Sequence, residues 1–465
     1  MKKKILTYLY IALFMLMLLI PGLGILIFGE AQSAANEILA SRPRFTNRDG
    51  GFNTQFLSDF SDYIGDRFAF RQEFVTAWAW LNAKLLNTSV EDQVLLGTDG
   101  WLYYTSTMAD YMGQGLTDGQ LRSAARNLAL MREYGERQGA DFLFTVAPNK
   151  NSLYPEHMPD YIPALPGSNA SRLPAFLAAE EVPYADLYAV FRAQDEVLYY
   201  RTDSHWTNRG AALAADTLLA ALGRDSAYFT GGLSADLYRS DIPPSLSLHR
   251  GDLYEMLYPA GKKTEADIAM EPNSFTTDSD TNDGNAITIR SHSHGSGTLL
   301  CFRDSFGRAL YPYLAEAYGE ALFSRQTAYD LTQIADLGAD TVLIELVERN
   351  IAWLLTEPAV FPAPARNAEV VALLPDTAAM EPVSISTVAG ATANTASLFR
   401  VSGLLPEGTA EGTNVYIALD GTWYEACVTL DEAGQAGFSA WLPAGEGAVR
   451  LLADCGGWTL YGTTR

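Results

Sequence analysis

The sequence predicts an α/β protein in which helices flank both faces of a mainly parallel sheet, followed by a small β-rich domain. Three observations predict this fold class. Between residues 93 and 364, short apolar runs alternate with helical segments, which is typical of a parallel sheet. After residue 364, short β-rich runs separated by Gly, Pro and Asp turns replace the helices. At the N-terminus, one uncharged apolar run is long enough to cross a membrane.

The N-terminal segment carries the clearest physical signal. Lys2, Lys3 and Lys4 precede an uncharged apolar run from Ile5 to Phe28. A spanning helix needs about 20 such residues, and basic residues stay on the cytoplasmic side. We therefore expect residues 1–30 to form a cytoplasmic stub and a single-pass transmembrane anchor, with the body outside the cytoplasm. A cleaved signal peptide is the alternative, because small residues follow at positions 31–35.

Residues 31–92 are expected to form a stalk and a helical lead-in. Apolar residues recur at helical spacing from Phe56 to Leu85, which predicts two helices. Beyond them, the turn residues 97–100 separate two apolar runs, which predicts a hairpin over residues 94–104.

Residues 93–364 are expected to form the main domain. Its predicted strands are short apolar runs: 141–146, 183–187, 298–302, 321–323 and 340–346. Its predicted helices are 117–138, 171–180, 208–222, 306–318 and 330–337. The first of these helices starts at Thr117-Asp118-Gly119-Gln120, which has the form of a capping box.

Residues 365–465 predict a small β-sandwich, because turn signals recur at about ten-residue spacing. The segment is rich in aromatic residues: Trp423, Tyr424, Trp441, Trp458 and Tyr461. Flat aromatic faces stack on sugar rings, so a carbohydrate-binding domain is one interpretation. The alternative is that these side chains form the core and edges of the sandwich.

Charge and cysteine content exclude several classes of protein. The net charge is -23 and the pI is near 4.6, so the chain is unsuited to bind a nucleic-acid backbone. Three cysteines without a CxxC pair argue against a disulfide scaffold or a zinc ribbon. Cys427 and Cys455 pair if the body is exported, or else are small buried side chains.

Two short motifs are candidates for chemistry. Asp203-Ser204-His205-Trp206 precedes a predicted helix, and Arg303-Asp304-Ser305-Phe306-Gly307 lies between a predicted strand and a helix. Ligands bind at the carboxyl ends of parallel strands, so we expect both loops at that edge. A serine there needs a base, and a neutral histidine held by an aspartate supplies one.

Each motif also has a structural interpretation. Ser and Asp are common helix N-caps, which would account for Ser305 and Asp304. An Asp-x-His pair is frequent in surface loops, and a metal site at Asp203 and His205 lacks an apparent third ligand. The chain has five histidines: His157, His205, His249, His292 and His294. Of these, His292 and His294 lie in a Ser/Gly-rich stretch and are expected in solvent.

A family resemblance decides between these interpretations. Asp203-Ser204-His205-Trp206 resembles the Asp-His-His-Trp motif of the SGNH-hydrolase-like alginate O-acetyltransferases and their Gram-positive relatives, although Ser204 stands where that motif has His. Four more blocks resemble the family in its order: residues 95–103, 146–156, 303–306 and 344–350. The resemblance covers about residues 53–355 and implies a flavodoxin-like SGNH sheet.

The resemblance implies an acyl-transfer enzyme. Ser305 would be the nucleophile, His205 the base and Asp203 its partner, moving acetyl to a cell-surface or secreted polysaccharide through an acyl-serine. It also implies an acyl donor and a multi-spanning membrane-bound O-acyltransferase as partner. No P-loop or dinucleotide fingerprint follows any predicted strand, so no cofactor or metal is expected. An acetylesterase with the same triad and a non-catalytic polysaccharide-binding or assembly protein are the alternatives.

Further residues are candidates for substrate contact. Tyr311 follows Ser305 by about two helical turns, and its alternative is core packing. Lys150 either attracts an anionic sugar or is solvated on its loop. The other candidates for substrate contact are Trp206, Arg325, Glu345 and Arg349.

Overall fold

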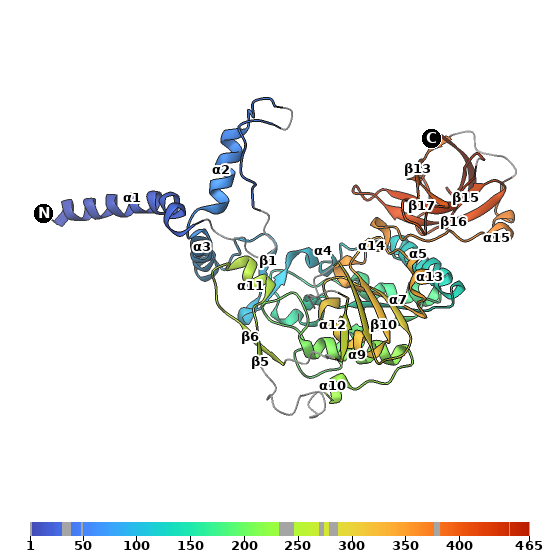
Figure 1. Cartoon of the computed structure of the whole chain (residues 1–465), viewed down its shortest axis with the longest axis horizontal. Coiled ribbons are helices and arrows are strands. Elements are labelled where there is room, and N and C mark those ends of the chain that lie inside the picture. Colours follow the sequence, from blue (N-terminus) through green and yellow to red (C-terminus); the bar gives the residue numbers. More distant parts are fainter. Residues whose placement is uncertain are drawn as a thin grey trace.

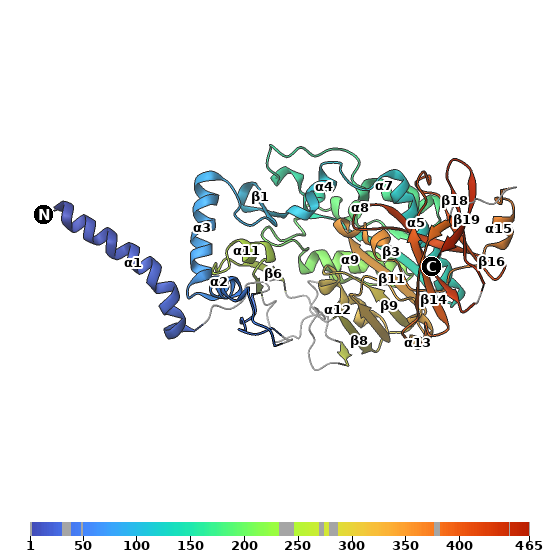
Figure 2. The same ribbon diagram turned by 90° about the horizontal axis from the view of Figure 1, so that it is seen from above.

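The structure, a computed structural model, describes residues 2–29, 39–47, 50–231, 246–268, 274–278, 287–375, 382–445 and 447–464. The molecule is elongated, and its parts follow one another along the long axis (Figures 1 and 2). N-terminal helices lie at one end, a helix-covered sheet lies in the centre, and the β-rich C-terminal region lies at the other end.

The central sheet has seven strands in the order β4-β3-β11-β9-β10-β8-β7. Their bounds are β3 (Asp141–Ala147), β4 (Tyr184–Ala185), β7 (Phe275–Thr277), β8 (Thr288–Ser293), β9 (Thr298–Phe302), β10 (Glu320–Ser324) and β11 (Thr341–Val347). The five strands from β4 to β10 run parallel, which confirms the predicted sheet. Strands β8 and β7 add an antiparallel edge that the sequence did not indicate.

Both faces of the sheet are covered because its strands are apolar on both sides. Leu143 and Leu343 point into one core, and their neighbours Phe144 and Ile344 point into the other. The first core packs on α8 (Leu187–Arg192), α9 (Asn208–Ala221) and α12 (Gly307–Ala317). The second packs on α5 (Asp118–Arg137), α7 (Asn169–Ala179), α13 (Gln333–Leu337) and α14 (Trp353–Thr356).

The capping box predicted at residue 117 is confirmed. The Gln120 N–H donates to the Thr117 hydroxyl at 3.1 Å, and the Thr117 N–H donates to the Gln120 side chain at 3.0 Å. Two of the four orphan N–H groups at the start of α5 are thus satisfied. A long helix therefore begins at a fixed residue and covers one face of the sheet.

The N-terminal region is helical. It contains α1 (Lys2–Phe28), α2 (Phe56–Arg67) and α3 (Arg71–Leu86), then the hairpin of β1 (Val94–Leu96) and β2 (Leu102–Tyr104), which confirms the two helices and the hairpin. Among the described residues, no helix combines the length and the apolar character needed to cross a membrane. The predicted anchor over residues 1–30 is therefore not supported.

The C-terminal region is β-rich, as predicted, and its strands are connected through β16, whose first half pairs with β15 and whose second half pairs with β17. Eight strands follow the order β12-β19-β18-β15-β16-β17-β14-β13. The two end strands, β12 and β13, are separated in sequence only by Ile385, so the sheet curls until its ends meet. The bounds are β12 (Pro382–Ser384), β13 (Ser386–Ala389), β14 (Leu398–Leu404), β15 (Val415–Leu419), β16 (Thr422–Leu430), β17 (Ala436–Pro443), β18 (Arg450–Asp454) and β19 (Trp458–Thr464).

The cysteines and aromatic residues of this region are mostly structural. Cys427 and Cys455 are both free thiols, so they do not form the disulfide considered above. Each of the five aromatic side chains is buried or half-buried, and Trp423 is 7% exposed within a core cluster. The interpretation as core residues therefore fits better than an exposed stacking platform.

A second hairpin lies beside the central sheet. Strands β5 (Leu246–His249) and β6 (Glu265–Ile268) pair antiparallel, with α11 (Asp252–Leu257) between them. The sequence did not predict this hairpin. The remaining short elements are α4 (Met108–Tyr111), α6 (Lys150–Leu153), α10 (Tyr228–Gly231), α15 (Asn367–Val371) and 3₁₀ turns at Thr98–Gly100, Thr105–Thr107, Pro155–His157 and Glu348–Asn350.

Candidate active site

Ser305 lies in the sharp turn between β9 and α12, at the carboxyl end of a parallel strand. Its hydroxyl is 2.9 Å from Nε2 of His205. The residue that caps α12 is Phe306, and its N–H donates to the Asp304 carboxylate at 2.9 Å. The turn is therefore held by Asp304, while the Ser305 hydroxyl faces the imidazole instead of the helix.

His205 reaches Ser305 from a tight loop. An isolated bridge between Tyr199 and Trp206 closes this loop, so the loop does not follow a strand of the central sheet as expected. Asp203 accepts from the backbone N–H of His205 at 2.8 Å and lies 2.7 Å from its Nδ1. An ionised carboxylate only accepts, so Nδ1 carries the proton and Nε2 is left as the acceptor for the Ser305 hydroxyl.

Charge stabilises this arrangement. Burial raises the pKa of Asp203, but the adjacent His205 and His249 outweigh it, so the pKa lies well below the usual range. Burial lowers the pKa of His205, but the Asp203 carboxylate outweighs this effect and the pKa is raised. The loop therefore holds an ionised acid against a histidine of increased basicity.

The other oxygen of Asp203 contacts the β5–α11 segment. Nε2 of His249 lies 2.7 Å from Oδ2, and the Asp252 N–H donates to the same oxygen at 2.8 Å. The Asp252 carboxylate accepts from both the N–H and the hydroxyl of Ser204, at 2.7 and 2.6 Å. Sequence reasoning did not identify His249 and Asp252 as site residues, because they stand in no recognisable motif and reach Asp203 only in the folded protein.

Asp252 also supplies the third metal-ligating group that the sequence did not show. One ligand atom each from Asp203, His205 and Asp252 lies within 4.8 Å of the others. However, the hydrogen bond from His205 Nδ1 to Asp203 uses a proton that a bound cation would displace. The geometry therefore favours proton transfer at this cluster.

Lys150 was expected either above the site or in solvent, and both expectations are wrong. The side chain is 4% exposed, and Nζ donates to the carbonyl oxygens of Tyr200, Arg201 and Asp203. Burial lowers its pKa to about 8. Lys150 therefore stabilises the loop that carries Asp203 by donating hydrogen bonds to its backbone.

Two other candidates for substrate contact lie in the core. Trp206 is 1% exposed and packs against Phe191 and Phe306. Tyr311 is 4% exposed and meets Phe323 edge to face. Their burial corrects the expectation of direct substrate contact and supports the core-packing interpretation.

A cavity of about 340 Å³ opens beside Ser305. It is lined by Tyr104, Ser106, Asp304, Ser305, Arg325, Arg349, Asn350 and Trp353. Arg325 and Arg349 are thus placed where the sequence predicted them, whereas Glu345 is fully buried behind the turn and accepts from the Asp304 N–H at 3.2 Å. Sequence reasoning did not identify the remaining residues that line the cavity, because they come from separate elements.

The two backbone N–H groups that follow Ser305 are already engaged. Phe306 donates to Asp304, and the backbone of Gly307 bonds the buried Glu345 carboxyl. An oxyanion needs donors that point into the cavity. The guanidinium of Arg349 lies over the Phe306 ring at 5.5 Å and lines the same cavity as Ser305.

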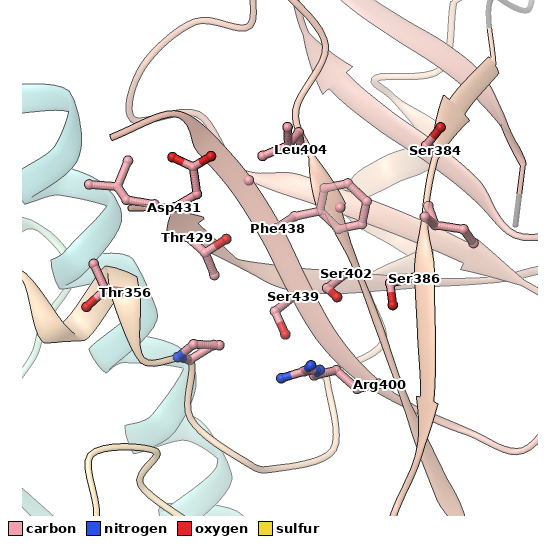
Figure 3. A pocket seen from close by; sticks show the side chains of 15 residues that line it. Thr356, Ser384, Ser386, Arg400, Ser402, Leu404, Thr429, Asp431, Phe438 and Ser439 are labelled. Atoms are coloured by element: carbon pink, nitrogen blue, oxygen red, sulfur yellow. The ribbon is translucent and has the colours of Figure 1, made fainter. Parts of the chain in front are cut away.

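A second, larger groove lies where the C-terminal sheet meets the central domain (Figure 3). Its volume is about 530 Å³. The hydroxyls of Ser386, Ser402 and Ser439 lie around the Arg400 side chain in this groove. Nε of Arg400 is buried and has no hydrogen-bond partner among the described residues.

Residues 94–293 match the family described as "SGNH hydrolase-like domain, acetyltransferase AlgX". The expected family resemblance is confirmed. The matched range ends before the Ser305 turn, so the pairing of this serine with His205 depends on the geometry described above.

Two curated relatives and one solved structure are similar to the chain. The probable alginate O-acetylase AlgJ of Pseudomonas syringae pv. tomato is 30% identical over 257 residues, covering 52% of this chain and 61% of the relative. Its counterpart from Pseudomonas fluorescens is 26% identical over 273 residues, covering 56% and 64%. The chain thus spans less than two thirds of either relative. The O-acetyltransferase domain of Pseudomonas putida AlgJ is 18% identical, covering 56% of this chain and 92% of that chain, with a TM-score of 0.38.

Proposed function

We propose that the chain is a serine-dependent O-acetyltransferase that acetylates hydroxyls of a polysaccharide. The observation that carries this proposal is the continuous chain of hydrogen bonds from Asp203 through His205 to Ser305 beside an open cavity. The similarity to probable alginate O-acetylases supports acetyl as the group and a polysaccharide as the acceptor.

The reaction proceeds in two halves. Nε2 of His205 takes the hydroxyl proton as Ser305 Oγ attacks the carbonyl carbon of the acyl donor. The tetrahedral intermediate collapses, His205 returns the proton to the leaving oxygen, and an acyl-serine remains. In the second half, His205 takes the proton of a sugar hydroxyl as its oxygen attacks the acyl carbon. The tetrahedral intermediate collapses, and His205 returns that proton to Ser305 Oγ as the serine leaves, which restores the free enzyme.

We infer that a side chain from the cavity wall stabilises the oxyanion. The N–H groups of Phe306 and Gly307 are bonded to carboxyl groups, and the Asn350 amide donates to the Asp304 carboxylate at 2.8 Å. We therefore assign stabilisation of the developing charge to the Arg349 guanidinium, which lines the same cavity as Ser305. A guanidinium in a partly enclosed cavity stabilises an oxyanion strongly because few water molecules screen it.

The test is reaction with p-nitrophenyl acetate, with and without an oligosaccharide acceptor. We expect the intact protein to accumulate an acetyl group on Ser305, seen by mass spectrometry, and Ser305→Ala to lose at least about 10³-fold in rate. Ser171→Ala, an exposed serine on α7, is the matched control. Acetylated sugar identifies a transferase, and free acetate alone identifies the esterase. Neither acyl-serine nor acetate release in folded protein leaves the non-catalytic binding protein.

We further propose that the body acts outside the cytoplasm, beside the membrane-bound O-acyltransferase that the family resemblance implies. The basic and then apolar N-terminal sequence supports export, whether or not that segment remains attached. An alkaline phosphatase fused after Arg465 should be active in cells, whereas a fusion lacking residues 1–30 should be inactive. Inactivity of both fusions would rule export out, and equal activity of both would show that residues 1–30 do not direct it.

Carbohydrate binding by residues 365–465 remains a proposal, and the groove in Figure 3 is the place that suits it. Its hydroxyls and the unsatisfied Nε of Arg400 can bond to sugar oxygens. In affinity electrophoresis through a polysaccharide gel, we expect Arg400→Ala to migrate faster than the unaltered protein. Equal migration of the two proteins excludes the groove as the binding site.

A further inference from the structure

We propose that His249 is a positioning residue of the active site, which holds the catalytic carboxylate of Asp203 through the oxygen that does not face His205. The inference rests on the proposed acyl-transfer chemistry. His249 lies on β5, outside both sequence motifs, and touches neither Ser305 nor the cavity.

The first argument is the number of donors around Asp203. A carboxylate has about four acceptor positions, and four donors meet this one. The N–H and Nδ1 of His205 bond Oδ1. Nε2 of His249 and the Asp252 N–H bond Oδ2. His249 is thus the side-chain donor on the far side of a carboxylate that is 3% exposed.

The second argument is that the His249 ring is itself held in place. It stacks on Tyr200 with ring centroids 4.0 Å apart and planes 20° from parallel. The Tyr200 hydroxyl bonds Asp267 on β6, which also accepts from the Asn208 N–H at the start of α9. The ring plane is therefore fixed independently of its bond to Asp203, as a positioning role requires.

The third argument is that the whole hairpin supports this loop. Glu265, opposite His249 in the β5–β6 register, accepts from the N–H groups of Arg201 and Thr202. At Gly251, a Cβ atom would lie 2.2 Å from the Thr202 carbonyl oxygen, so only glycine permits this approach. The hairpin thus braces the two residues that precede Asp203 in the sequence.

The consequence concerns the orientation of His205. Without the His249 donor, Oδ2 keeps one bond, and the carboxylate can rotate about its Cβ–Cγ axis. Rotation weakens the bond to Nδ1 that directs Nε2 at Ser305. Hydrogen bonds to charged groups are stronger than those between neutral groups, so losing this one should slow the acylation of Ser305. We expect a rate loss of about 10- to 100-fold, or roughly 1.4–2.7 kcal/mol.

The test compares variants of the full chain in their reaction with a fluorophosphonate probe. His249→Phe keeps the stacked ring and removes the donor, whereas His249→Gln keeps an N–H near the same position. We expect His249→Phe to lower the maximal labelling rate about 10- to 100-fold at unchanged probe affinity, and Gln to restore it to within a few-fold. His292→Phe on β8, a half-exposed histidine bonded to Asp278, is the matched control.

A second readout separates positioning from loss of structure. In protein with ¹⁵N-labelled histidine, the Nδ1 proton of His205 should be visible at low field in the unaltered protein and Gln variant, and should broaden or shift upfield in His249→Phe. If the Phe variant does not fold, the pair His249→Leu and His249→Gln makes the same comparison.

The outcomes for the two proposals are distinct. Folded His249→Phe that reacts at the unaltered rate, while Ser305→Ala does not react, overturns the role of His249 and leaves the acyl-transfer proposal intact. Failure of the unaltered protein to react at all refutes the acyl-transfer proposal itself.

Discussion

Nε2 of His205 faces the Ser305 hydroxyl on one side of the ring, and Nδ1 is held by the Asp203 carboxylate on the other. The charged groups that act on it are Asp203, Asp252 and Arg349, and the two carboxylates prevail over burial and the guanidinium to raise its pKa. A raised pKa means that the ring stays protonated, and therefore inactive as a base, to a higher pH than an unperturbed histidine.

We predict that acylation rises with pH and levels off above the raised pKa of His205. Below that pKa, the rate should fall about tenfold per pH unit, because only the neutral ring accepts the serine proton. Asp203→Asn removes the carboxylate charge, so the acid limb should move to lower pH. The plateau should also fall by about 10³-fold or more, because an amide no longer fixes the tautomer.

The measurement is the fluorophosphonate labelling rate from pH 4.5 to pH 9. Asp160→Asn, at an aspartate on the surface, is a control for the added amide. An acid limb that stays in place in folded Asp203→Asn would show that another group titrates.

The sequence pointed to Ser305, His205 and Asp203 because each stands in a short motif of neighbouring residues that can be recognised without the structure. The roles of His249 and Lys150 could not be recognised in this way. Each lies about 50 residues from Asp203 in the sequence and contacts the Asp203 loop only in the folded protein. A lysine in a loop is also expected in solvent, and its burial depends on three carbonyl oxygens that the sequence does not reveal.

At the scale of elements, the ends of β3 and β11 are joined by a buried acid. Glu348, in the 3₁₀ turn after β11, is fully buried and accepts from the Asn149 N–H at 2.8 Å. Burial is the main cause that raises its pKa to about 8, and the nearby Asp110 adds to the shift. At pH 7, the folded protein therefore holds a proton on Glu348 that the unfolded chain releases.

The sign of the resulting pH dependence follows from that proton. Between the unfolded pKa near 4.5 and the folded pKa near 8, the native state binds more protons, so stability falls as pH rises. Glu348→Gln removes the titration and keeps an oxygen for Asn149. We predict a melting temperature for the variant that depends less on pH between 5 and 8 and exceeds that of the unaltered protein at pH 8.

Thermal melts at half-unit pH intervals would measure this. Glu136→Gln on the exposed face of α5 is the control, since its ion pair with Arg132 is largely in solvent. Identical pH slopes for Glu348→Gln and the unaltered protein would contradict the prediction.

Elements buried on both faces were the most predictable. Strands β3, β9 and β11 read as continuous apolar runs and were placed to within a residue or two. Strand β8, next to the edge strand β7, reads as polar because its residues alternate between exposed and buried, and the exposed ones are polar. The β5–β6 hairpin is short and carries charged residues that serve the active-site loop, so neither length nor periodicity marked it.

At the scale of the whole molecule, the C-terminal sheet is joined to the central domain by charge. Glu425 on β16 has a side chain only 1% exposed and receives Arg126 from α5 at 2.7 Å and Arg366 at 2.8 Å. Arg126 also pairs with Glu180 at 2.9 Å. The sequence suggested a boundary near residue 364, but could not show that α5 and β16, 299 residues apart at this contact, meet here.

A neutral contact completes the junction. The Asn127 amide donates to the carbonyl oxygens of Leu354 and Val428, and its oxygen accepts from the Val428 N–H at 3.1 Å. The two regions therefore share satisfied polar groups across their interface. This arrangement favours a fixed orientation over a flexible tether.

Glu425 is the residue on which this junction depends. Glu425→Gln leaves the guanidinium groups of Arg126 and Arg366 facing an uncharged amide in a partly buried setting. Arg126 keeps Glu180 and Arg366 keeps Glu133, so the cost should stay below the about 3–5 kcal/mol of a buried ion pair broken from one side, and we predict a melting temperature lower by a few degrees. The separation of the two regions should also make the segment around residues 357–366 sensitive to protease before the protein melts.

The control is Asp118→Asn, whose pair with Arg172 involves a side chain 74% exposed, and which should change stability by about 1 kcal/mol or less. Since the Ser305–His205–Asp203 chain is built within the central domain, labelling by the fluorophosphonate at low temperature should persist in Glu425→Gln. A variant that melts and resists protease like the unaltered protein would show that Asn127 and apolar contacts hold the regions together. Loss of labelling in the folded variant would show instead that the C-terminal sheet supports the active site.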